Sequence, residues 1–340
     1  MALQPMFISG WKQLSAYKIF NGKNPKFIYY TRAIAMMCIP RLLLSLKLKD
    51  IDNILERRAD RDYILDRVDY YCKDSSYSDI DYKKWIENSV RICKQPMTCQ
   101  KVYYYDSMEY ARYFGPNELW RLLPGDINYI PDLPSIVKSR PIDGDNHNAI
   151  LLKLDKVRHF IFTNDNIPWR NKKDCALFRG KVAGKEQRLK FMQRWFGNPR
   201  IDAGVIDRDM KEWAKPKLTI HEHRPYRFIL AIEGNDVASN LKWVMSSNSI
   251  AIMPRPQFET WFMEGRLKPN YHYIEVKPDF SDLLERMDYY SAHPEEAEVI
   301  IKHAHEYIDQ FRDSRRERLI SLLVLRKYFK GVKQIRKHSN

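Results

Sequence analysis

Four basic residues fall within ten positions of the chain and directly follow a short apolar segment. They are Arg179, Lys181, Lys185 and Arg188, and the segment before them, residues 176–178, has the composition of a buried strand. Basic side chains at a strand end, combined with free N–H groups in the first turn of the next helix, can bind a diphosphate. A solvated helix face would carry the same charges, so the cluster alone leaves both interpretations open.

The stretch 227–253 predicts elements that could position such a site. Residues 228–232 form an apolar run typical of a strand buried on both faces, and the turn 233–236 follows it. A helical pattern then covers 237–245, and residues 250–253 predict the next buried strand. This order is one unit of a parallel α/β sheet, in which ligands lie at the carboxyl ends of the strands.

Glu233 stands at the end of the first of these strands. Its carboxylate could accept hydrogen bonds from ribose hydroxyls, and a phosphate would meet the unpaired N–H groups that begin the helix. An ordinary surface acid is the alternative interpretation of Glu233. We expect a nucleotide to bind along residues 233–240, with Arg179 and Arg188 lining the same cleft.

Other motifs in the sequence do not distinguish a functional site from a chance pattern. The pattern 180–186 resembles a phosphate-binding P-loop, but it is one residue short and has Glu186 where a magnesium site would need Ser or Thr. Asp-x-Asp pairs recur four times, at 50/52, 79/81, 143/145 and 207/209, so none of them stands out as a metal site. We therefore expect no metal.

The net charge of +15 is concentrated at the two ends of the chain. Residues 1–49 contain eight basic residues and no acid, and residues 312–338 contain ten basic and two acidic residues. A nucleic-acid-binding protein more often carries basic charge around a groove, so we expect no nucleic-acid partner. The five cysteines form no CxxC pair and no secretory signal is evident, which indicates reduced thiols and a cytoplasmic location.

Both basic ends are also apolar. Residues 33–46 read AIAMMCIPRLLLSL and residues 319–325 read LISLLVL. The first segment is too short to span a membrane and is interrupted by Pro40 and Arg41. Two interpretations remain open: ordinary helices with a buried stripe, or peripheral docking on the anionic surface of a membrane.

Several segments together resemble glycosyltransferase family 90. They are Phe178-Arg179-Gly180, residues 227–242 (RFILAIEGNDVASNLK), residues 258–265 (FETWFMEG) and residues 267–274, in this order. The resemblance extends over about 130–310 and is strongest to the bacterial branch that builds lipopolysaccharide cores. It implies a GT-B fold, in which two Rossmann-like α/β domains face each other across a cleft. It also implies a UDP-sugar donor and inversion at the anomeric carbon, with no metal and no other cofactor.

The resemblance divides the chain into three parts. Residues 1–170 are expected to form an acceptor-side domain with a basic helical start, and residues 171–311 a Rossmann-like domain that binds the nucleotide sugar. The boundary lies near 165–175, where the composition turns polar. Residues 312–340 are expected to form a basic C-terminal helix that packs back on the first domain.

The family pattern also assigns residues to the donor side. Arg179, Gly180 and Arg188 match the Phe-Arg-Gly strand end and a downstream arginine, and Lys242 matches a basic position of the strand–helix unit. Asn240 stands where the eukaryotic enzymes carry a donor-binding arginine. Glu233, before Gly234, stands where they carry another arginine.

The base that deprotonates the acceptor is expected in the loop after the strand predicted at 135–139. Asp143 is the first choice and Asp145 the alternate, and Gly144 between them would let the loop approach the donor. Glu259 and Asp165 are the next candidates. Either loop aspartate could instead cap a turn.

These residues predict a glycosyltransferase that moves a sugar, a hexose by resemblance, from a UDP-sugar to a lipopolysaccharide core or a related lipid-linked glycan. It would work in the cytoplasm, at the inner face of the membrane. The alternative is a non-catalytic basic protein that binds nucleic acid or an acidic glycan.

Overall fold

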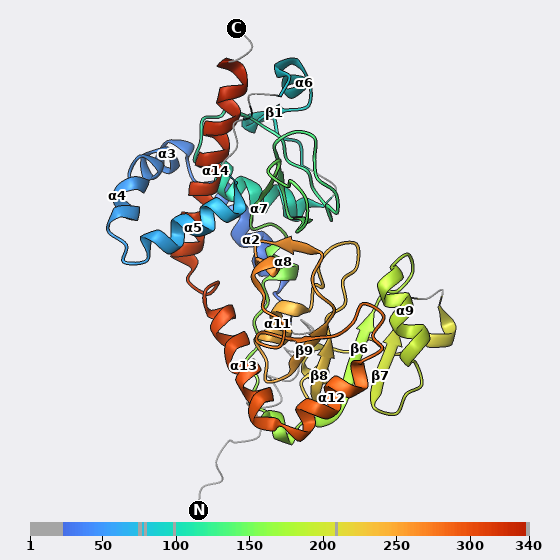
Figure 1. The fold of residues 1–340 in the computed structure, drawn as a ribbon. Coiled ribbons are helices and arrows are strands. Elements are labelled where there is room, and N and C mark those ends of the chain that lie inside the picture. The colour runs from blue at the N-terminus through green and yellow to red at the C-terminus, as the bar shows by residue number, and fades with distance from the viewer. Residues whose placement is uncertain (1–22, 74–76, 78–79, 98–99, 208–209, 338–340) are drawn as a thin grey trace, which may run out of the picture.

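The computed structural model describes residues 23–73, 77, 80–97, 100–207 and 210–337. Figure 1 shows helices and short strand pairs in the upper half of the molecule and a parallel sheet in the lower half. The chain runs from the upper half into the sheet, and its last helix returns to the upper half. The fold class is therefore mixed α/β.

The lower half is built on a five-stranded parallel sheet with the order β11-β9-β8-β6-β7. Its strands are β6 (Lys173–Gly180), β7 (Ile201–Val205), β8 (Tyr226–Leu230), β9 (Ile250–Met253) and β11 (Ile274–Glu275). From β6 the chain proceeds first to β7 on one side and then to β8 on the other. The boundary between β6 and β8 is thus the topological switch point, where open α/β sheets bind their ligands.

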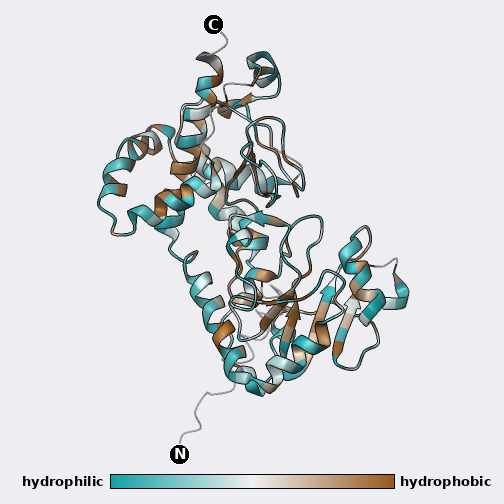
Figure 2. Cartoon of the chain, viewed as in Figure 1, coloured by the Kyte–Doolittle hydropathy of each residue, from teal (hydrophilic) through white to brown (hydrophobic). Residues whose placement is uncertain are grey.

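Successive side chains of β8 point to opposite faces of the sheet, and apolar residues are buried on both faces. Phe228 and Leu230 pack into one apolar cluster with helices α9 and α12, while Ile229 packs into a second cluster with α11. A strand with both faces buried needs an apolar run, and residues 228–232, which begin within β8, form one (Figure 2). The covering helices are α9 (Glu186–Trp195), α11 (Leu241–Met245), α12 (Leu283–Ala292) and α13 (Pro294–Asp309).

The upper half contains helices and only short strands. The helices are α2 (Lys26–Met37), α3 (Arg41–Lys49), α4 (Ile51–Glu56), α5 (Arg61–Tyr71), α6 (Tyr82–Glu87), α7 (Lys101–Ala111) and α8 (Lys156–His159). The strand pairs are β1 (Val90–Arg91) with β2 (Leu119–Trp120), β3 (Ser135–Val137) with β5 (Ala149–Leu151), and β4 (Ser139–Pro141) with β10 (Phe258–Thr260). Among the described residues, only the lower half has a Rossmann-like sheet, so the GT-B arrangement remains a prediction.

The last helix, α14 (Ser314–Lys337), packs against α5 and α7 of the upper half. Its apolar residues, including Leu323 and Leu325, are buried there. A buried ion pair joins Arg67 Nη1 on α5 to Glu317 Oε1 on α14 at 2.6 Å. The helix thereby ties the C-terminal end of the chain to the helices of the upper half.

The structure corrects one local prediction. The helix predicted over 237–245 begins only at Leu241, and the residues before it form an irregular segment in which Val237 and Ala238 are buried. A short helix, α10 (Ile220–His223), precedes β8. Residues 160–163 are mostly apolar but form no strand, and the Thr163 N–H donates to the Ser246 hydroxyl.

Candidate functional site

A cavity of about 550 Å³ lies at the switch point of the sheet. Its floor consists of the residues at and just beyond the carboxyl ends of β6 and β8. Asp126, Arg158 and His159 of the upper half line it as well, so the cavity lies between the two halves of the molecule. We call it the switch-point pocket.

Arg188, on the first turn of α9, connects the two strand ends below this pocket. Its guanidinium donates to the carbonyl oxygens of Lys181 at 2.9 Å, Ile232 at 2.7 Å and Glu233 at 2.9 Å. Burial lowers the pKa of Arg188 to about 10, and no carboxylate accepts a hydrogen bond from it among the described residues. Nη1 and Nη2 each retain one N–H without a partner in the described structure, and an anion in the pocket could accept both.

Two glycines lie beside this guanidinium. A Cβ on Gly234 would stand 3.2 Å from Arg188 Nη2, closer than an ordinary contact, whereas a Cβ on Gly180 would first meet the Phe178 ring, at 2.9 Å, and Arg188 Nη1 only at 3.4 Å. Gly234 has no positive φ, so its role is close approach and not the sharp turn expected from the sequence. Both glycines and Arg188 line the switch-point pocket as predicted.

Several cations converge on the pocket without a carboxylate partner. Lys23, Lys181 and Lys217 line it and form no ion pair in the described residues, while Lys185 Nζ donates to the neutral side chain of Asn235 at 2.7 Å. Burial lowers the pKa of Lys23, and the charge of Lys217 lowers it further. Positive charges held this close to one another favour the binding of an anion.

Arg179 lines the pocket, but its charge is already paired. Its guanidinium donates to Asp202 Oδ1 at 2.9 Å and to three backbone carbonyls, those of Phe178, Asp202 and Pro216. Asn240 also lines the pocket, and its amide donates to the carbonyl oxygen of Leu230 at 2.9 Å. Both side chains therefore hold the ends of β6 and β8 in place.

Two predicted donor residues lie outside the pocket. Lys242 is fully buried and pairs with Glu264 Oε1 at 2.8 Å, because the short helix α11 directs it into the core. The Glu233 carboxylate accepts the backbone N–H groups of Gln257 and Phe258, so it holds the start of β10. Lys242 therefore lies outside the cleft in which it was predicted, whereas Glu233 lines an adjoining cavity of about 310 Å³ that shares Lys185 and Gly234 with the switch-point pocket.

The predicted bases are also displaced from the pocket. Asp143 and Asp145 are exposed in the loop between β4 and β5 and do not line it, and Asp145 instead pairs with His147 Nδ1 at 2.7 Å. This loop turns outward at Gly144, whose φ is +87°. Glu259 is buried against Arg140.

Asp165, the other candidate for the base, stabilises the fold. Its carboxylate pairs with Lys172 Nζ at 2.6 Å and with Arg224 Nε at 3.0 Å. The Asn248 N–H donates to the same carboxylate at 3.0 Å. These contacts join the segment before β6 to the ends of α10 and α11, away from the switch-point pocket.

The carboxylates that do line the pocket are Asp126 and Asp236. Lys138 lies between them and pairs with both, at 2.6 Å to Asp236. Asp236 is almost completely buried, whereas the Asp126 side chain, which belongs to the upper half, is 27% exposed. Burial raises the pKa of Asp126, but Lys138 and Arg158 outweigh burial and hold the pKa below its usual value. Its loop has no sequence pattern that singles it out.

The remaining wall of the pocket is apolar and aromatic. Leu218, Ile220 and Trp243 line it, and the rings of His223 and Trp243 lie edge to face at 5.2 Å. Burial lowers the pKa of His223, so the imidazole is neutral at neutral pH. The pocket thus combines a cationic part with a flat apolar part.

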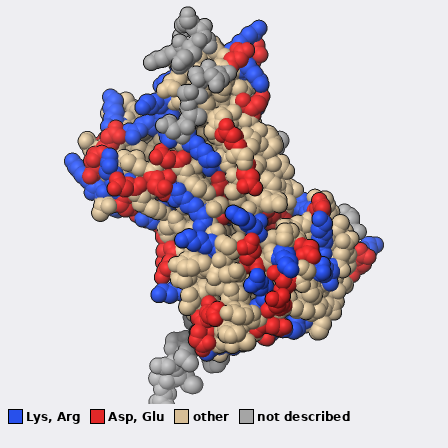
Figure 3. Space-filling view, viewed as in Figure 1, with Lys and Arg blue, Asp and Glu red and all other residues tan. Residues whose placement is uncertain are grey.

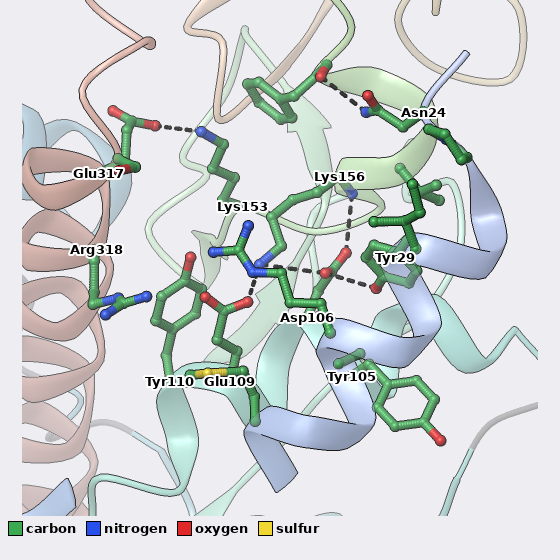
Figure 4. A pocket seen from close by; sticks show the side chains of 18 of the residues that line it. Asn24, Tyr29, Tyr105, Asp106, Glu109, Tyr110, Lys153, Lys156, Glu317 and Arg318 are labelled. Atoms are coloured by element: carbon green, nitrogen blue, oxygen red, sulfur yellow. Dashed lines mark hydrogen bonds and ion pairs between the residues drawn. The ribbon is translucent and has the colours of Figure 1, made fainter. Parts of the chain in front are cut away.

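A second cavity, of about 400 Å³, lies among α2, α7, α8 and the start of α14. Figure 4 shows Asp106 between Tyr29 and Lys156: the Tyr29 hydroxyl donates to it at 2.8 Å and the Lys156 N–H at 2.9 Å. Lys156 also pairs with Glu109 at 2.6 Å. Most charges here are paired with one another. This cavity is therefore less suited to bind an anion than the switch-point pocket is.

The described residues contain no group of three or more His, Cys, Asp or Glu side chains that could hold a metal ion. One of the Asp-x-Asp pairs, 79/81, and another, 207/209, include a residue outside the described part of the chain. Asp207 itself accepts the backbone N–H groups of Val182 and Ala183.

Comparison with known proteins gives consistent matches. Residues 149–330 match the model of the family described as glycosyl transferase family 90. The chain is 42% identical over 247 residues to O-glucosyltransferase LpsA of Dichelobacter nodosus, which covers 72% of this chain and 77% of that protein. It is 31% identical over 147 residues to protein O-glucosyltransferase 3 of Homo sapiens, which covers 41% of this chain and 28% of that protein.

Proposed function

Because this chain belongs to glycosyl transferase family 90 and is a glycosyltransferase, we propose that it moves a hexose from a UDP-sugar to a hydroxyl of a lipopolysaccharide core or related lipid-linked glycan. The names of two similar proteins, both O-glucosyltransferases, support glucose as the transferred sugar. The observation that carries the donor assignment is the convergence of unpaired cations at the switch point of the sheet.

The two parts of the pocket fit the two parts of a nucleotide. Lys181, Lys217 and the free N–H groups of Arg188 would bind the diphosphate, and the wall at Trp243 would pack against the base. The same cations would stabilise the charge of the departing diphosphate. This supports transfer without a metal, and turnover is then expected to survive a chelator.

We propose Asp126 as the base, in place of Asp143 or Asp145. It reaches the pocket from the half opposite the donor cations, where an acceptor hydroxyl must approach. The hydroxyl oxygen attacks the anomeric carbon from the face opposite the diphosphate, the bond to the diphosphate oxygen breaks, and Asp126 takes the hydroxyl proton. Attack from the opposite face inverts the anomeric configuration. Because Lys138 and Arg158 hold the pKa of Asp126 below its usual value, its carboxylate is ionised at neutral pH.

A panel of nucleotide sugars in a thermal-shift assay tests the donor class. UDP-hexoses should stabilise the fold more than GDP- or ADP-hexoses do, since only the true donor class binds the native state tightly. UDP release should then require a core oligosaccharide as acceptor. Equal shifts for all nucleotides, with no release of UDP, would contradict the proposal.

Lys217 provides the residue-level test. Lys217→Ala should weaken UDP binding about fivefold, with a smaller effect at high salt, because one unpaired cation is lost from the pocket. Lys302→Ala on α13, whose side chain is 73% exposed, is the matched control and should leave the affinity unchanged.

The alternative, a nucleic-acid-binding protein, has less support. On the face shown in Figure 3, basic and acidic side chains alternate, and no unbroken basic band crosses it. Salt-dependent retention on DNA together with no effect of any nucleotide sugar would favour this alternative.

A further inference from the structure

Helices α2 and α3 carry apolar side chains that the protein does not bury. No residue of α2 is buried, and Leu44 is the only buried residue of α3. The exposed fractions of the large apolar side chains range from 51% to 81%. They are Phe27 81%, Ile34 52%, Leu42 71%, Leu43 52% and Leu46 51%. Apolar residues gathered in this way mark an interaction surface.

The same two helices are purely basic. Residues 23–49 contain six Lys or Arg and no acidic residue. Lys26, Arg32, Lys47 and Lys49 are exposed, and none of them forms an ion pair within the described part of the chain. The surface therefore offers apolar side chains together with uncompensated positive charge.

The other basic end of the chain differs in this respect. On α14, Arg316 pairs with Asp60 at 3.2 Å, Arg326 with Asp52 at 2.6 Å, and Lys327 with Asp69 at 2.7 Å. The apolar residues of α14 are buried against α5 and α7. Much of the charge of α14 is thus paired within the fold, whereas the exposed basic residues of α2 and α3 form no ion pair among the described residues.

Two other occupants of this surface fit less well. No single helix of the described residues is long and apolar enough to cross a membrane, and α2 and α3 pass such a test only together, with a bend of 83° between them. A second copy of the chain, packed about a twofold axis, would bring like charges together, which disfavours association.

We propose that α2 and α3 dock this enzyme on the surface of an anionic bilayer. The apolar side chains would enter the region between headgroups and acyl chains, and the exposed lysines and arginines would lie at the lipid phosphates. Each basic residue at such a surface strengthens binding about fivefold. The proposal does not depend on the donor assignment, because neither helix lines the switch-point pocket.

Flotation with lipid vesicles tests this docking. The full-length chain should float with vesicles of phosphatidylcholine mixed with phosphatidylglycerol, should remain unbound with phosphatidylcholine alone, and should dissociate as salt is raised. Leu42→Ser with Leu43→Ser, and separately Lys47→Glu with Lys49→Glu, should each reduce binding at least about tenfold. Val299→Ser with Lys302→Glu, an exposed pair on α13, is the matched control and should bind like the wild type.

Three results would overturn the proposal. The first is wild-type protein that does not float with anionic vesicles, or whose binding is insensitive to salt. The second is unchanged binding in both α3 double variants. The third is a dimer in light scattering that the leucine substitutions dissociate, which would assign the surface to a second copy. UDP affinity is expected to be unchanged in every variant. An unchanged value shows that the variants are folded, and it allows a failure of membrane docking to be distinguished from a failure of the donor-site assignment.

Discussion

Gly234 lies against Arg188, and a single methyl group at position 234 would press on the guanidinium. A Cβ at position 234 would stand 3.2 Å from Nη2 and 3.4 Å from Cζ of Arg188. The guanidinium is itself fixed by three backbone carbonyls at the ends of β6 and β8. The geometry of the switch-point pocket therefore depends on a residue that has no functional group.

Substituting Gly234 with Ala should weaken UDP binding several-fold, because the guanidinium must shift by a few tenths of an ångström to make room for the new Cβ. Calorimetric titration with UDP measures the effect. Gly115→Ala is the control, since its Cβ would meet only ordinary contacts, at 3.5 and 3.7 Å. Unchanged UDP affinity in the Gly234 variant would show that Arg188 does not shape the donor site.

Asp126→Asn should lower turnover by about two to four orders of magnitude while leaving donor binding nearly intact. Loss of the proton acceptor affects the chemical step, whereas the proposed diphosphate contacts, Lys181, Lys217 and Arg188, belong to the lower half of the molecule. Initial rates and UDP-sugar affinity should be measured together. Asp143→Asn and Asp145→Asn serve as matched controls in the exposed loop. A large loss of turnover in either control, with an active Asp126 variant, would restore the base to that loop.

The sequence predicted those features of the fold that depend on a local pattern of residues. The apolar run at 228–232 and the spacing of Arg188 after β6 depend on neighbouring residues. The run overlaps β8, which ends at Leu230, and Arg188 lines the switch-point pocket. Lys242 was misplaced because its partner, Glu264, is 22 residues away and only the folded chain brings them together.

Asp126 escaped prediction for a related reason. It belongs to an irregular loop and reaches the pocket only because Lys138 holds it near Asp236, a contact between the two halves of the molecule. No spacing along the chain encodes such a contact. For a site that lies between two halves of the molecule, sequence patterns therefore predict only some of the residues.

Glu317→Gln should destabilise the fold by about 3–5 kcal/mol, because Arg67 and Lys153 would remain buried with uncompensated charges. The Trp261 indole N–H, which donates to the same carboxylate at 2.7 Å, would also be affected. Urea unfolding measures the change. Glu306→Gln removes an exposed ion pair with Lys302 and should have no measurable effect. Equal stability of the two variants would contradict a structural role for the buried cluster.

Glu233 should make the stability of the fold depend on pH. Burial raises its pKa from 4.5 to about 8, against the opposing effect of the Phe258 and Gln257 N–H groups. The folded state then binds more protons than the unfolded state between these values, so stability should fall as pH rises through this window.

Thermal unfolding of the wild type and of Glu233→Gln between about pH 5 and pH 8 checks the sign and the assignment. The melting temperature of the wild type should fall more than that of the variant over this range, by about 2 °C or more. Glu285→Gln, an exposed substitution on α12, should keep the wild-type profile. Parallel profiles for the wild type and Glu233→Gln would show that another group is responsible.

A crystal structure of the chain with UDP bound tests the central claim most directly. The account predicts the diphosphate at the carboxyl ends of β6 and β8, in contact with Lys181, Lys217 and the free N–H groups of Arg188, and the uracil against Trp243. UDP bound in the cavity beside α2, or anywhere else outside the switch-point pocket, would contradict it.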